Sequence, residues 1–88
     1  MAGNTRGKLK EHFEGVHKNF EWILHHVAIS ATLIENQLSQ MPQFEAVKGD
    51  AEKEQAYFNE NSMYRAVIAL GEGVSTLDEL AKNVYATF

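Results

Sequence analysis

Apolar residues recur at steps of three and four through most of the chain, in two long runs on either side of a single proline. At 100° per residue, the first run stays within an arc of about 100°, which is the pattern of an amphipathic helix. Its members are Leu9, Phe13, Val16, Phe20, Ile23, Val27, Ala31, Ile34, Leu38 and Met41. Because proline disfavours the helical conformation in the residue before it, Pro42 ends this helix. The spacing predicts one helix over about residues 6–40.

The second run has a regular heptad spacing, in which steps of four and three alternate. Its members are Met63, Val67, Leu70, Val74, Leu77, Ala81, Val84 and Phe88. Such a seam is typical of helices that pack nearly parallel or antiparallel along their length. It predicts a helix over about residues 50–87, with Asp50 as its N-cap. Two glycines and two capping-box sequences at 71–76 allow a kink in this helix or the start of a new one. The apolar spacing continues unchanged across these residues, however, and favours one helix.

The segment between the two runs, residues 41–49, is short and begins with a proline and ends with a glycine. This asymmetry favours one or two helical turns. Residues 1–18 carry a surplus of two positive charges and residues 72–88 a surplus of two negative charges, which suits an antiparallel arrangement. The sequence therefore predicts a single all-α domain over 1–88, an antiparallel hairpin of two long helices with a short helical connector.

Composition excludes several classes of function. The absence of cysteine rules out disulfides, thiolate metal sites and cysteine nucleophiles. Eight basic residues against twelve acidic ones give a net charge of −4, which argues against a nucleic-acid partner. No apolar run approaches the length of a membrane span, and the first residues lack an apolar signal core. We therefore expect a cytoplasmic protein with no membrane partner.

A second set of apolar and aromatic residues falls outside the two stripes. It comprises Trp22, His26, Ile29 and Leu33 on the first helix and Tyr57, Tyr64 and Ile68 on the second. In an antiparallel hairpin these residues fall at similar heights and predict a patch on its outside. Large apolar patches are unusual on monomers, and a chain of this size is marginally stable alone. The patch predicts a homodimer that forms a four-helix bundle; the alternatives are a docking surface for another protein and a pocket for a small ligand.

A polar and aromatic cluster on the second helix is a further candidate for ligand binding. It consists of Tyr57, Asn61, Tyr64 and Arg65. Aromatic faces, an amide and a guanidinium can hold an anionic or nucleotide-like ligand by stacking and hydrogen bonding. Helical geometry places Arg65 on the side away from the two tyrosines, so the rim of an interface is the favoured interpretation.

All four histidines lie on the first helix, where His17, Glu21 and His25 recur at intervals of four residues. Histidine and carboxylate at this spacing can bind one metal ion. The second helix offers no histidine to complete such a site, so a solvated polar face is the favoured interpretation, and no metal or cofactor is predicted. Ser30 follows His26 by one turn, but no acid completes a triad, and no catalytic residue is predicted.

These observations predict a non-enzymatic, small acidic binding protein that acts by protein–protein contact as an accessory, adaptor or inhibitor. One alternative is a protein that sequesters a small ligand at the interhelical or dimer interface. Another is a structural hairpin subunit of the secretion type, or its chaperone. The plan of the hairpin resembles that of type III secretion needle subunits and Trp-x-Gly hairpins, but the connector contains neither Pro-x-x-Pro nor Trp-x-Gly.

Overall fold

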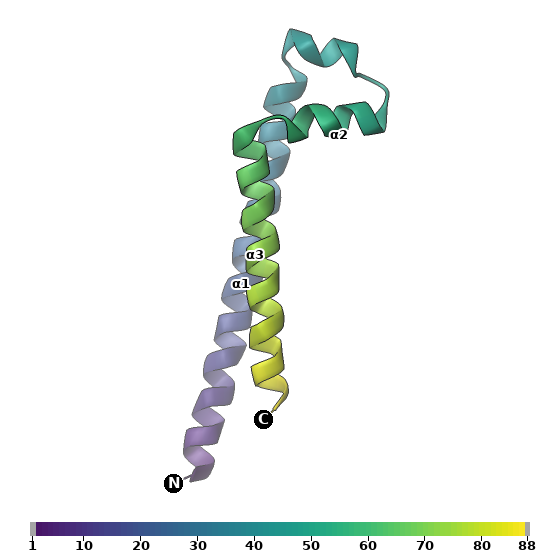
Figure 1. Ribbon diagram of the computed structural model, residues 1–88. Helices are drawn as coiled ribbons and strands as arrows, with labels where there is room; N and C mark the ends of the chain where they lie inside the picture. The colour runs from purple at the N-terminus through teal and green to yellow at the C-terminus, as the bar shows by residue number, and fades with distance from the viewer. Residues whose placement is uncertain (1, 88) are drawn as a thin grey trace.

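Two long antiparallel helices make up most of the molecule. The computed structural model describes the backbone of residues 2–87 and the side chains of residues 5–87. The elements are α1 (Ala2–Ser39), the short 3-10 helix η1 (Pro42–Ala46), α2 (Ala51–Asn59) and α3 (Ser62–Ala86). Figure 1 shows α1 and α3 side by side, with α2 lying across their closed end. The predicted all-helical hairpin is confirmed, and its extents are 65 × 19 × 17 Å.

The connector between the long helices follows the sequence prediction. Met41 is extended, with φ −79° and ψ 145°, because it precedes Pro42 at the start of η1. Gly49 has φ +93°, a left-handed conformation that suits glycine. Asp50 then caps α2, since its side chain accepts a hydrogen bond of 3.2 Å from the Lys53 amide.

The sequence predicts one helix over residues 50–87, and the structure corrects this prediction at Asn61. Asn61 is extended, with φ −79° and ψ 124°, and its side chain accepts a 2.9 Å hydrogen bond from the Tyr64 amide. Arg65 Nη1 donates to the Asn59 carbonyl at 3.1 Å and so satisfies the end of α2. Asparagine is among the preferred N-cap residues, and here its capping outweighs continuation of the helix.

The sequence also allows a kink at 71–76, but α3 passes through these residues as one continuous helix. Gly71 lies where α3 approaches α1: a Cβ atom on it would lie 3.0 Å from Val27 Cγ1. The missing side chain therefore permits close contact between the two helices at this height.

Substituting alanine for glycine tests this close approach. Gly15 of α1 is the matched control, because a Cβ there would meet nothing within 4 Å. We expect Gly15→Ala to raise the free energy of unfolding by about 0.5–1 kcal/mol. Gly71→Ala should gain less or lose stability, because Val27 must move. Urea denaturation of the two variants measures the difference, and an equal gain at both positions would contradict the packing described here.

The residues of α3 that face α1 form a heptad seam, which we call the contact seam. Its members are Tyr64, Val67, Gly71, Val74, Asp78 and Ala81, all buried or half-buried. The predicted seam is therefore correct at Val67, Val74 and Ala81. It is wrong at Met63, Leu70, Leu77 and Val84, which are exposed. Its last member, Phe88, lies outside the described residues. In place of Met63, Leu70 and Leu77, the residues that follow them in the chain face α1. These are Tyr64, Gly71 and Asp78, which hydrogen bonds or close packing hold in place.

Candidate functional site

The apolar residues that the contact seam leaves out belong to a second heptad seam on α3, which we call the outer seam. Its members are Met63, Ala66, Leu70, Gly73, Leu77, Leu80 and Val84. Each of the first six precedes a contact-seam residue by one position, so the outer seam is rotated from it by about 100°. Its five large residues are 40–65% exposed. Helix α3 thus carries two apolar seams and uses one of them within the hairpin.

The outer seam continues onto α1 through a groove between the two helices. The groove has a volume of about 320 Å³ and is lined by Trp22, Ile23, His26, Val27, Ser30, Val67 and Leu70. Trp22 is 64% exposed, and its ring lies edge-on to that of His26 with 4.2 Å between ring centroids. We call the outer seam, together with Trp22 and Ile23, the apolar face of the hairpin.

The structure brings together only part of the predicted outer patch. Trp22 and His26 share the groove, as described. Ile29 and Leu33 lie instead in a separate shallow hollow of about 300 Å³ that α1 forms alone, beside His25. Ile68 is exposed, but helical spacing places it on the side of α3 that carries Lys82, away from the outer seam.

Tyr57 and Tyr64 lie in a different environment from the one that the sequence predicts. Tyr64 is only 4% exposed and is buried within the hairpin itself. Tyr57 is half-buried, and its hydroxyl donates a hydrogen bond of 3.0 Å to the Leu38 carbonyl of α1. The break at Asn61 explains the difference, because it turns α2 across the end of the hairpin and takes Tyr57 out of phase with α3.

These tyrosines belong to an aromatic cluster that closes the hairpin. Its rings are Phe44, Tyr57, Phe58 and Tyr64, with neighbouring centroids 5.6–5.9 Å apart. The Tyr64 hydroxyl donates to Glu35 Oε2 at 2.7 Å and accepts a 3.4 Å hydrogen bond from Gln55 Nε2. The Gln55 hydrogen bond lowers the pKa of Tyr64, but burial and the Glu35 carboxylate outweigh it, so the pKa is raised above 10.0. The hydroxyl therefore stays protonated and keeps its bond to α1.

The four candidates for ligand binding on the second segment have structural partners of their own. Asn61 caps α3, and Arg65 donates to the last carbonyls of α2. The two tyrosine hydroxyls are bonded to α1. The group therefore serves to join α1, α2 and α3 at the closed end.

A polar cluster around the buried Asp78 links the two long helices nearer the open end. Asp78 of α3 is 5% exposed, and its Oδ1 lies 2.6 Å from His17 Nδ1 of α1. The other ring nitrogen of His17 contacts the Glu21 carboxylate, and Lys82 Nζ lies 3.7 Å from Asp78 Oδ2. Both ring nitrogens of His17 therefore face carboxylate oxygens. Sequence reasoning missed Asp78; its signal was a polar residue in phase with Val74 and Ala81.

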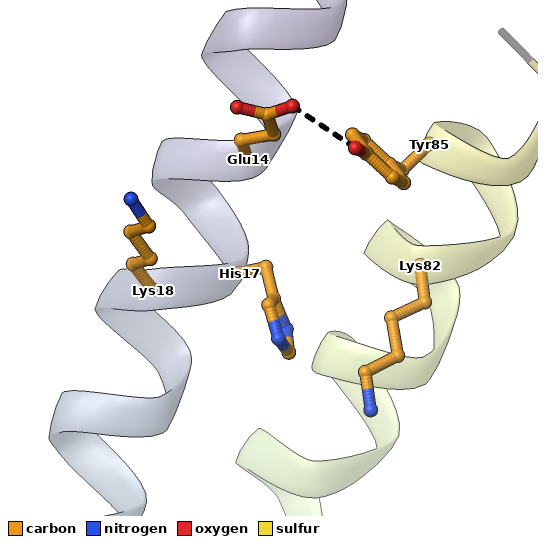
Figure 2. Close-up of a pocket in the computed structure, with 5 residues that line it drawn as sticks. All are labelled: Glu14, His17, Lys18, Lys82 and Tyr85. Carbon is orange, nitrogen blue, oxygen red and sulfur yellow. Dashed lines mark hydrogen bonds between the residues drawn. The ribbon is translucent and has the colours of Figure 1, made fainter.

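Beside this cluster lies a small cavity of about 180 Å³ between α1 and α3. In Figure 2, Glu14 and His17 point from α1 toward α3, whereas Lys18 points away. The Tyr85 hydroxyl donates to Glu14 Oε1 at 2.9 Å, and this bond raises the pKa of Tyr85. The cavity is smaller than the roughly 300–1,000 Å³ typical of sites for small molecules.

The fold separates His25 from the other two members of the row whose spacing made it a weak metal candidate. His17 and Glu21 stay together, but His25 lies away from them in the hollow with Ile29. Within the described part of the chain, no three histidine, aspartate or glutamate side chains are placed to hold a metal ion.

No known protein family, curated protein or solved structure matches the chain. Among residues 2–87, none of the helices has both the length and the apolar content needed to cross a bilayer. The apolar face is therefore the candidate functional site, and its geometry is the evidence for it.

Proposed function

We propose that the protein is a non-enzymatic binding protein that acts as a homodimer, in which two hairpins join through their apolar faces as a four-helix bundle. As an accessory, adaptor or inhibitor, it acts by protein–protein contact. The observation that carries the proposal is the exposure of the complete outer seam beside Trp22. Contiguous apolar surface of this kind marks interaction sites in soluble proteins.

The surface area of the hairpin agrees with a missing partner. Its accessible surface is 6550 Å². A compact monomer of 9.9 kDa is expected to expose about 5,200 Å², so the hairpin exposes roughly 1,300 Å² more. Burying that excess on each of two chains gives an interface within the range of about 2,000–5,000 Å² that is typical of obligate homodimers. A second copy of the hairpin is therefore a partner of suitable size.

Two pairs of residues with catalytic chemistry support binding over catalysis, because the fold uses them to join its helices. His17 and Asp78 bond to each other across the two helices, and Tyr64 bonds to Glu35. In the described part of the chain, every buried side-chain nitrogen or oxygen has a hydrogen-bond partner. These groups hold the hairpin together and present no reactive centre to solvent.

Sedimentation equilibrium of wild type and Leu70→Glu tests the proposal. We expect wild type to have twice the mass of the 9.9 kDa chain. Glutamate at position 70 would place an unpaired charge in the interface, which costs several kcal/mol. The dissociation constant should therefore rise by about 100-fold or more, and the variant should sediment as a monomer.

Ile68→Glu is the matched control, since it makes the same kind of change two residues away on the other side of α3. It should remain dimeric, and both variants should keep the helical circular dichroism of wild type because both sites are exposed in the hairpin. A wild-type monomer at about 100 μM, or a Leu70→Glu variant that dimerises like wild type, would overturn the proposal.

A further inference from the structure

The arrangement of the outer seam also indicates how the second copy docks. We infer that the dimer is built on α3: the outer seam of each α3 packs antiparallel against the outer seam of the other, around a two-fold axis near Gly73. The inference rests on the proposed homodimer and specifies its interface.

The angle between the two seams fits a helix with two neighbours in a square bundle. The outer seam is rotated by about 100° from the contact seam, since the two differ by one residue. In a four-helix bundle of square section, each helix has two neighbours at about 90° to each other. With α1 on the contact seam, a second helix of similar length fits on the outer seam.

The sizes of the outer-seam residues favour an antiparallel neighbour. Small residues, Ala66 and Gly73, alternate with Met63, Leu70 and Leu77. In antiparallel helix pairs the first core position of each heptad faces the second core position of the neighbour, whereas in parallel pairs like faces like. Antiparallel pairing of α3 with its copy can therefore place Leu70 opposite Gly73 and Leu77 opposite Ala66, with the large Leu80 opposite Met63.

Gly73 marks the centre of this contact. A Cβ atom on Gly73 would meet nothing within 4 Å in the hairpin, so the glycine is not required for packing against α1. In the antiparallel pair it faces Leu70 or Leu77 of the second copy and leaves room for that side chain. Its height is also that of the groove, because the neighbouring Gly71 packs on Val27, which lines the groove.

Helix α1 offers a poorer surface to α3 of the second copy. Besides Trp22 and Ile23, the positions of α1 that flank the groove at heptad spacing are polar and include Asn19, His26, Ser30 and Gln37. Packing these side chains on the leucines of the outer seam would bury polar groups against apolar ones, which is unfavourable without new hydrogen bonds. When α3 pairs with α3, the polar positions of the two α1 helices face one another instead.

Distances between spin labels on the two copies test this orientation. The chain has no cysteine, so Thr76→Cys and Asn83→Cys each give one labelling site. Both residues are exposed and occupy the same heptad position, so their separation across the bundle is similar. In the antiparallel pair, with Gly73 facing Leu70 or Leu77, the two copies of residue 83 are about 24–35 Å apart along the axis and those of residue 76 about 3–14 Å, at 1.5 Å per residue.

We expect the pulsed-EPR distance for position 83 to exceed that for position 76 by on the order of 10 Å. Equal distances at the two positions would mean that the two hairpins are related by an axis along the bundle. That result would overturn the inference while leaving the homodimer intact. A label-free mass measurement that shows only monomer would overturn both. Ala69→Cys, at the same heptad position, replaces Thr76→Cys if the latter loses helicity.

Discussion

Replacing Tyr64 with alanine is expected to lower the free energy of unfolding by about 3–5 kcal/mol, the range seen when large buried aromatic side chains are truncated. Tyr64 is the most buried large residue in the described part of the chain, at 4% exposure. Its ring packs on Phe58, and its hydroxyl is bonded to Glu35. The variant loses both the ring contact and the link from α3 to α1, so we expect the closed end of the hairpin to open first.

Urea denaturation at fixed protein concentration measures this effect, because dimerisation would make stability depend on concentration. Tyr64→Phe keeps the ring and removes the hydroxyl, and it should cost only about 1 kcal/mol. Tyr85→Ala is a second control, since Tyr85 is exposed near the open end. A Tyr64→Ala variant no less stable than Tyr85→Ala would show that the aromatic cluster does not hold the hairpin together.

Substituting His17 with alanine is expected to cost about 2–3 kcal/mol, because it leaves the buried Asp78 carboxylate without its 2.6 Å partner. Lys82 remains 3.7 Å away, and its partial compensation keeps the loss below that of a fully isolated buried charge. Urea denaturation at neutral pH again provides the measurement.

The double variant His17→Leu with Asp78→Leu distinguishes the charge from the packing. Exchanging both members of a bonded polar pair for apolar residues leaves no partner unsatisfied and is often neutral or stabilising. We therefore expect the double variant to recover at least the stability that His17→Ala loses. If the double variant is as unstable as His17→Ala, the loss comes from the packing of the imidazole ring and not from the unpaired carboxylate.

Much of the fold follows from the sequence because apolar spacing determines it. The period of the first stripe and Pro42 together give α1 and its end. The break at Asn61 was missed because one N-cap asparagine is a weak signal beside a long helical period, although the hydrogen bond to the Tyr64 amide decides it locally. Helix propensity and apolar spacing do not tell whether that hydrogen bond is more favourable than continuing the helix through Asn61.

The candidate site was predictable only in part, for a different reason. Trp22 and His26 were found because they are large, and they lie outside the first stripe. The predicted seam mixes residues of the outer seam with residues of the contact seam, because leucine at heptad spacing gives no indication of which of two neighbours it faces. Asp78 was missed because a polar residue is buried only where a partner satisfies it. That partner, His17, is 61 residues away in the sequence.

Because α3 carries two apolar seams, it could pack on α1 in two orientations about its own axis. A turn of about 100° about its own axis would place the leucine-rich outer seam on α1 in place of the contact seam. Apolar burial alone does not oppose that turn. The polar contacts do, because His17 meets Asp78, and Glu35 meets the Tyr64 hydroxyl, in only one setting. Directional bonds thus fix the rotation of α3 and leave its leucine-rich outer seam exposed.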